Sequence, residues 1–366
     1  MIRKFILPLL VPVLLVSSCK PKVAEIESDL GIVKEISGNT GNRYRRLMSE
    51  NRVSPSGCIC LVGQEDILRR ISMGLRRFDS RDNASGSFGA DGLPDFAGET
   101  IVSIIDTVNV PYSMPSGQNA HALREMTVCQ AMLAVDTLSH ISPYDFKGLG
   151  EKKSSKIIVL ADPYPACFGS DDVRGLFSYF GYGVPVMSSL EIMLKEIFKE
   201  MPSANVGILC DGRYEGSGIY EESFRKYRDE YGAEGAECFV LSLDDRNAVL
   251  RNFLDRYQEA GNSRPLDVLV VEDMRLDADN VKAEVAGLVS LLSQDSVKYG
   301  NLLSARFHIK DAISSIASES YDYLRTSNLF SHKISLPVCE YYFAVPSLSE
   351  NDEGAYILIQ DNYVQN

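Results

Sequence analysis

Short apolar runs recur along most of the chain and are separated by polar, turn-prone stretches. Most of these runs are continuously apolar instead of alternating with polar residues, which is typical of strands that are buried on both faces of a sheet. Residues 57–63 form the first such run. The later ones are Ile101–Ile105, Ile157–Ala161, Val184–Met187, Val206–Cys210, Phe239–Leu243, Leu266–Val271 and Ala305–Ile309.

The segments between these runs carry apolar residues at helical spacing. Leu190, Met193 and Ile197 form one stripe, and Tyr220, Phe224 and Tyr227 form another. Similar stripes begin at Val281 and at Leu250. Buried strands alternating with amphipathic helices predict an α/β fold with parallel sheets.

The strand–helix rhythm changes near Met201 and again near Tyr299, which favours two Rossmann-like lobes with an interlobe cleft over a single barrel. We therefore expect a first lobe over residues 55–201 and a second over residues 202–300. Residues 301–366 are expected to form a return segment and terminal strands. Ser80–Gly98 has no period and contains several glycines, so we expect a long loop there.

The N-terminus has a different pattern. Arg3 and Lys4 precede the apolar run Phe5–Val16, which is shorter than the roughly 20 residues needed to cross a bilayer. The run ends in Val16-Ser17-Ser18-Cys19, which resembles the lipobox of bacterial lipoproteins. The resemblance implies a signal peptide over residues 1–18 and a lipid-modified Cys19 carrying diacylglycerol and an amide-linked chain such as palmitate.

Two or three acyl chains would anchor the protein stably to a membrane. Residues 19–54 are polar and are expected to form a tether with one short helix around Asn42–Met48. Lys20, Pro21 and Lys22 follow the cysteine without an acidic residue, which favours the outer over the inner membrane in a diderm host. The alternative is an ordinary cleaved signal peptide with an accidental cysteine at position 19.

Net charge limits the partners that can be expected. Removal of residues 1–18 leaves 35 of the 37 Lys and Arg residues against 50 Asp and Glu, a net charge of −15. Such a surface repels phosphate backbones, so nucleic acid is not expected as a partner. Beyond Cys19, seven cysteines remain, and their spacing matches no zinc motif. We expect no metal, no cofactor and no catalytic residue of a recognisable motif.

Acidic residues follow four of the expected strands. Because the carboxyl ends of parallel strands meet at one edge of a sheet, these acids are expected to face one another across the cleft. Ser170 and Tyr214 lie in segments that follow two of the strands. The alternative is that each acid caps the next helix, which requires no ligand. The candidate ligand-binding residues are Asp106, Asp162, Ser170, Asp211, Tyr214, Glu272 and Asp273.

Two segments resemble type I periplasmic binding proteins. Residues 179–189 are similar to that family's "G-I-P-V-I-S" strand entry, and residues 205–218 are similar to its "V-x-x-x-x-D-x-x-Y-G-x-G" opening of the second lobe. Residues 126–138 look like the first long helix of its first lobe. The resemblance implies two lobes that close about a hinge on a small ligand.

These patterns together predict a membrane-anchored envelope lipoprotein that binds a small polar solute in its interlobe cleft. Two alternatives remain open. The first is a non-enzymatic partner protein of an envelope complex that uses Ser80–Gly98 as its contact loop. The second is an envelope hydrolase that uses the strand-end carboxylates, with or without Mg²⁺ or Ca²⁺.

Overall fold

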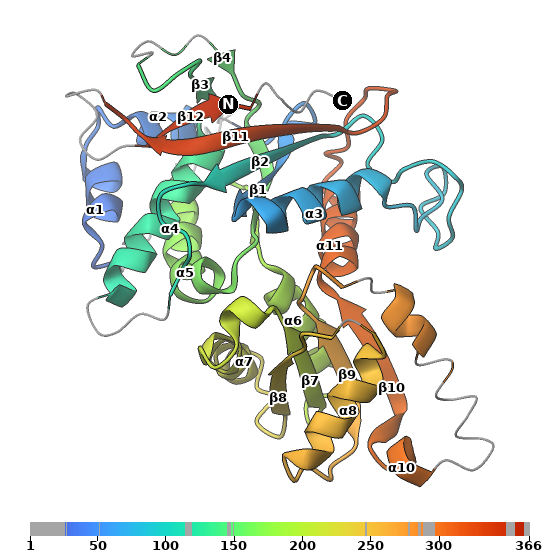
Figure 1. Cartoon of the computed structure of the whole chain (residues 1–366). Coiled ribbons are helices and arrows are strands. Elements are labelled where there is room, and N and C mark those ends of the chain that lie inside the picture. The colour runs from blue at the N-terminus through green and yellow to red at the C-terminus, as the bar shows by residue number, and fades with distance from the viewer. Residues whose placement is uncertain are drawn as a thin grey trace, which may run out of the picture.

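The computed structural model describes residues 26, 28–50, 52–113, 119–144, 148, 150–245, 247–276, 279–284, 287, 297–348 and 356–361. The chain folds into two α/β lobes, as the sequence predicts (Figure 1). Cys19 and the expected signal peptide lie outside the described residues. Within the described residues, no helix is long and apolar enough to cross a membrane.

The first lobe contains a six-stranded sheet in the order β12-β11-β2-β1-β5-β6. All neighbouring pairs are parallel except the antiparallel pair of β12 and β11. A small pair, β3 (Leu138–Ser139) and β4 (Gly150–Glu151), lies beside it. The strands of the large sheet are β1 (Cys58–Gly63), β2 (Thr100–Asp106), β5 (Ser155–Leu160), β6 (Val186–Met187), β11 (Val338–Pro346) and β12 (Tyr356–Gln360).

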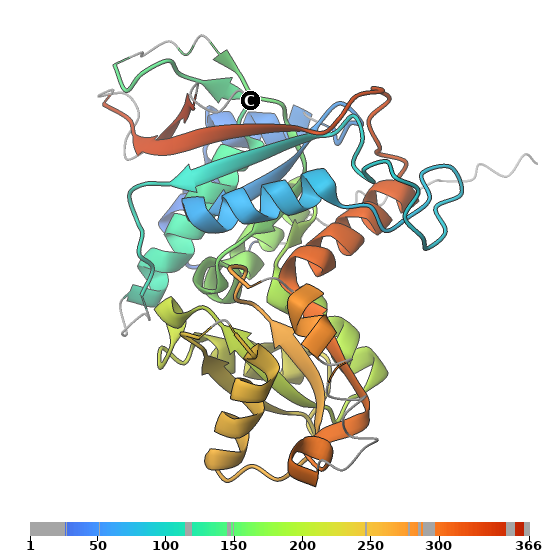
Figure 2. The same ribbon diagram turned by 45° about the vertical axis from the view of Figure 1, so that its right-hand side comes forward.

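Helices cover both faces of this sheet, which explains its continuously apolar strands. On one face, α3 (Glu65–Arg77) and α11 (Ala312–Thr326) pack against Ile59, Leu61 and their neighbours (Figure 2). On the other face, α4 (Asn119–Val135) and α5 (Pro163–Phe180) pack against Cys58, Cys60 and Val62.

The second lobe has a parallel four-stranded sheet in the order β10-β9-β7-β8. Its strands are β7 (Asn205–Cys210), β8 (Glu237–Ser242), β9 (Leu266–Val271) and β10 (Leu303–Asp311). One face packs against α6 (Ser189–Glu200) and α7 (Ile219–Glu230), the other against α8 (Val249–Glu259). The short α10 (Val297–Gly300) precedes β10, and the 3₁₀ helix η1 (Gly212–Tyr214) follows β7. The chain crosses between the lobes through α6 and again where β10 leads into α11.

Part of the expected tether belongs to the first lobe. Helices α1 (Gly31–Gly38) and α2 (Arg43–Glu50) bury Val33, Ile36 and Met48 in the core beside α4 and α5. The Ser28 hydroxyl donates a hydrogen bond to Asp172 (2.9 Å), and Arg43 pairs with Asp136. A tether over all of residues 19–54 was therefore wrong for residues 28–50, because their apolar side chains fill a groove of the first lobe.

Candidate active site

Each sheet has one switch point, where successive strands of the chain are added first on one side of a strand and then on its other side. In the first sheet, β1 is flanked by β2 and β5, and in the second, β7 is flanked by β8 and β9. Open α/β sheets bind ligands at the carboxyl ends of the two strands on either side of such a switch point. The two switch points face each other: Ala161 and Pro163 after β5 line the same cavity as Asp211 after β7 and Glu272 after β9. We call this region the junction.

Asp162 ties the two lobes together at the junction. One carboxylate oxygen accepts hydrogen bonds from the Gln64 side chain (2.6 Å) and from the Tyr214 hydroxyl of the second lobe, and the other accepts the Gln64 backbone N–H (3.0 Å). Gly63, at φ 154°, permits this approach, since a Cβ there would lie 2.5 Å from the carboxylate. Burial raises the pKa of Asp162 above its ordinary value, although the bonds from Tyr214 and Gln64 oppose the shift.

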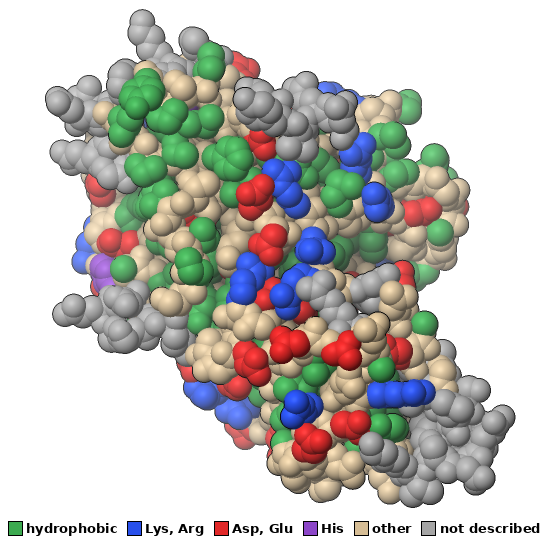
Figure 3. All heavy atoms as spheres, in the orientation of Figure 1, with side chains coloured by type: hydrophobic (Ala, Val, Ile, Leu, Met, Phe, Trp, Pro, Cys, Tyr) green, Lys and Arg blue, Asp and Glu red, His purple; other side chains and the backbone are tan. Residues whose placement is uncertain are grey.

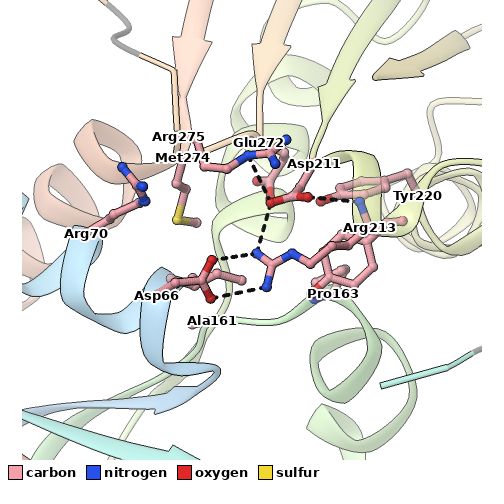
Figure 4. A pocket seen from close by; sticks show the side chains of 12 residues that line it. Asp66, Arg70, Ala161, Pro163, Asp211, Arg213, Tyr220, Glu272, Met274 and Arg275 are labelled. Atoms are coloured by element: carbon pink, nitrogen blue, oxygen red, sulfur yellow. Dashed lines mark hydrogen bonds and ion pairs between the residues drawn. The ribbon is translucent and has the colours of Figure 1, made fainter. Parts of the chain in front are cut away.

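A chain of ion pairs runs across the mouth of the junction. Arg213 contacts Asp66 on α3 (3.1 Å) and Asp211 (2.9 Å), and Arg275 contacts Asp211 (3.3 Å) and Asp273 (2.7 Å) (Figure 4). Burial disfavours the charged form of Asp211, but hydrogen bonds and charge from Arg213 outweigh it and lower the pKa of this carboxyl. Charged side chains of both signs gather where the lobes meet (Figure 3).

Glu272 differs from these paired acids. Its side chain is buried, and its Oε1 atom has no hydrogen-bond partner among the described residues. Burial raises its pKa to about 7, opposed by the Ser189 hydroxyl. A carboxyl that titrates near neutral pH in a cleft is suited to take up and release protons.

Glu272 and Asp162 line one cavity from opposite lobes. The cavity is also bordered by Ser188, Ser189 and Ser223, and the Ser188 hydroxyl has no partner among the described residues. Its free volume is about 10 Å³, as is that of the adjoining cavity at the mouth, which is roughly the space of one water molecule. The junction is therefore almost completely filled by side chains in this conformation.

The structure brings four of the seven sequence-predicted site residues to the junction: Asp162, Asp211, Tyr214 and Glu272. Asp273 lies beside it, paired with Arg275. Asp106 instead closes its own loop, where it accepts hydrogen bonds from the Val108 and Asn109 backbone N–H groups and from the Tyr112 hydroxyl. Ser170 is buried within α5 and borders neither junction cavity.

The capping alternative holds for one of these acids. Asp211 accepts the Arg213 backbone N–H (2.9 Å) at the start of η1, whereas Asp162 makes no such bond to α5. Sequence reasoning missed Gln64, Asp66, Arg70, Arg213 and Arg275. Gln64 could have been found, because it directly follows β1 just as the acids follow their strands.

The described residues contain no group of three or more potential ligands that could hold a metal ion. The Asp211 and Asp273 carboxylates are paired with arginines instead of converging on a shared point. The seven described cysteines are free thiols, and none of them lines either junction cavity.

No family model matches the sequence, and no curated protein matches it. Solved structures of similar fold include glutamate racemase from Francisella tularensis subsp. tularensis SCHU S4, with a TM-score of 0.47, 13% identity, and coverage of 80% of this chain and 90% of that one. Glutamate racemase isoform RacE1 from Bacillus anthracis gives a TM-score of 0.47 at 11% identity, with coverage of 83% and 96%. Picrophilus torridus aspartate racemase gives 0.33 at 11% identity, with coverage of 74% and 94%. At these identities the likeness concerns the fold alone.

The predicted function of a binder that holds a small polar solute in the interlobe cleft is contradicted. The three solved structures named above carry the names of racemases, not of binding proteins. Tyr214 and Arg213 fill the junction from the second lobe in this conformation, so no solute-sized cavity lies there unless the lobes open.

Proposed function

We propose that the chain is an enzyme that moves a proton at the α-carbon of a small carboxylic acid bound at the junction. Glu272 carries this proposal: it is a buried carboxyl with a pKa of about 7, it has an unpartnered oxygen, and it lies at a switch point. Likeness of fold does not assign a reaction.

The two lobes supply one acid–base group each. Glu272 of the second lobe takes the α-proton as the C–H bond breaks, and the electron pair moves into the substrate carboxyl group. Asp162 of the first lobe, whose pKa burial raises, returns a proton to the opposite face of the α-carbon once the substrate has displaced the hydrogen bond from Tyr214. Proton transfer by positioned groups of this kind contributes about 10²–10⁴-fold to a rate.

Arginines surround the mouth where the substrate carboxylate would lie. Arg213 and Arg275 come from the second lobe and Arg70 from α3 (Figure 4). Arg70 has no ion-pair partner among the described residues, so its guanidinium is available to a carboxylate. Positive charge at this place stabilises the negative charge that develops as the proton leaves.

Substrate binding requires the lobes to separate. The filled junction admits about one water molecule per cavity, so a substrate must displace the Arg213–Asp66 ion pair and the Tyr214–Asp162 hydrogen bond. The lobes are joined by two crossings, into α6 and into α11, which act as the hinge of such an opening.

Proton exchange in D₂O tests this function. A panel of amino acids, 2-hydroxy acids and 2-methyl acids is incubated with the protein, and loss of the α-proton signal is followed by NMR. We expect exchange of at least one class, a loss of about 10²–10⁴-fold in Glu272→Gln, and an unchanged rate in Glu259→Gln, which alters an exposed carboxyl. Absence of exchange across the panel, or an undiminished rate in Glu272→Gln, contradicts the proposal.

We propose further that the protein is anchored to the membrane of the cell envelope through lipid on Cys19. The support is the sequence pattern of residues 1–19 alone. An envelope protein partner is proposed as well, with Ser80–Gly98 as the contact loop, because Phe88 and Leu93 in that loop are exposed.

Cys19→Ala is expected to abolish lipid attachment without changing the folded lobes, since the packing seen among the described residues begins at Ile26. Metabolic labelling with a clickable palmitate analogue measures the attachment, and thermal unfolding of the purified variant measures stability. Equal labelling of wild type and variant would rule out Cys19 as the anchor.

A further inference from the structure

An open hollow adjoins the junction on the far side of Asp273. It lies between α3 of the first lobe and the carboxyl ends of β9 and β10, with a volume of about 370 Å³. The charged residues Arg77, Asp273, Asp279, Lys282 and Asp311 border it together with the apolar Ile313. This volume falls within the range of small-molecule sites, unlike the cavities beside Glu272.

Met274 separates the hollow from Glu272. Its side chain borders both the hollow and the cavity at the mouth of the junction, and that cavity is lined by Glu272 as well. It contacts the apolar cores of both lobes and points toward α3 (Figure 4). Methionine is unbranched and has three rotatable side-chain bonds, so it can swing aside by a change of rotamer as the lobes separate.

We infer that Met274 is the gate through which a small carboxylic acid passes from the hollow to Glu272. This inference rests on the proposed function and names the entry route and the residue that limits the size of the substrate. Arg77 supports it, because this exposed guanidinium borders the hollow, has no ion-pair partner among the described residues and attracts anions toward the gate. Lys282, by contrast, is neutralised by Asp311 (3.1 Å).

Carboxyl footprinting of the folded full chain tests the gate without requiring turnover. The protein is treated with a carbodiimide and glycinamide, and the modification of Glu272 is followed by peptide mass spectrometry. In Met274→Ala we expect modification to be about tenfold faster than in wild type, equivalent to a lowering of the access barrier by about 1.4 kcal/mol. Met274→Leu, which keeps an apolar side chain of similar volume, should behave as wild type.

An internal reference distinguishes gate opening from unfolding. Glu99 is fully buried far from the junction at the start of β2, so it is modified only when the first lobe opens globally. We expect its modification to be equally slow in all variants. Faster modification of Glu99 together with Glu272 in Met274→Ala would overturn the inference, because access would then come from unfolding.

A second variant distinguishes entry past Met274 from entry past Arg213. Arg213→Met removes the ion pair with Asp66 on the other side of the junction. If this variant accelerates modification of Glu272 while Met274→Ala does not, the gate inference is overturned and substrate enters past Arg213. That outcome would not affect the proposed proton transfer. Conversely, faster modification of Glu272 in Met274→Ala together with absence of exchange in D₂O would overturn only the proposed function.

Discussion

Lys156→Met is expected to lower the free energy of unfolding by about 3–5 kcal/mol, because it leaves a buried charge without a partner. The Lys156 ammonium lies 2.6 Å from a Glu99 carboxylate oxygen, and both side chains are completely buried. The ammonium also donates hydrogen bonds to the carbonyl oxygens of Leu329 (2.8 Å) and Pro55 (3.1 Å). The pair thus joins β5, the start of β2 and the segment before β11.

Urea unfolding at pH 7 measures this effect. Arg256→Met is the matched control, because Arg256 and Glu259 form an exposed pair on α8 for which a change of at most about 1 kcal/mol is expected. The double variant Glu99→Leu with Lys156→Met should recover part of the loss, since it removes both buried charges. A loss in Lys156→Met no larger than in Arg256→Met would show that the pair is hydrated in solution.

Lowering the pH from 8 to 4 is expected to stabilise the wild-type protein by about 3 kcal/mol more than Glu272→Gln. Burial raises the pKa of Glu272 from 4.5 to about 7, so the folded state holds this proton more tightly than the unfolded state. The stabilisation is fully present below pH 4.5 and is lost as the pH rises toward 7.

The difference between the two proteins isolates Glu272, because every other titrating group is shared. Urea unfolding of both proteins at intervals across this pH range provides the comparison. If the two stability curves run parallel, Glu272 has an ordinary pKa and is hydrated in the folded state.

The sequence predicts the central strands well. The expected run Ile157–Ala161 corresponds to β5 (Ser155–Leu160), and Val206–Cys210 corresponds to β7 (Asn205–Cys210). Strands buried on both faces consist of apolar residues throughout, so the apolar runs of the sequence locate them directly. Helix α2 corresponds to the short helix expected around Asn42–Met48, whereas α1 was missed because it has only eight residues and is flanked by polar segments.

The site was harder to predict than the fold. Asp106 and Asp162 both follow strands of the first sheet, but only Asp162 lies at the switch point, between β1 and β5. The order of strands in a sheet depends on tertiary packing, which the local pattern does not contain. The same holds for Arg213, because its contact with Asp66 spans 147 residues.

The function was harder to predict from the sequence than the fold or the site. An acid after a strand can cap a helix, pair with an arginine or titrate alone. Asp211 does the first two, and Glu272 is the third case. Which one occurs depends on burial and on neighbours from the other lobe. The solute-binding prediction treated all strand-end acids as equivalent ligand groups and therefore missed the filled junction.

The central claim is that Glu272 is an acid–base group tuned to neutral pH. An NMR titration of the protein labelled with ¹³C at glutamate side-chain carboxyls tests it directly, with the Glu272 signal assigned by its absence in Glu272→Gln. We expect a midpoint near pH 7 for this carboxyl. A midpoint near the ordinary glutamate value of 4.5 would contradict it.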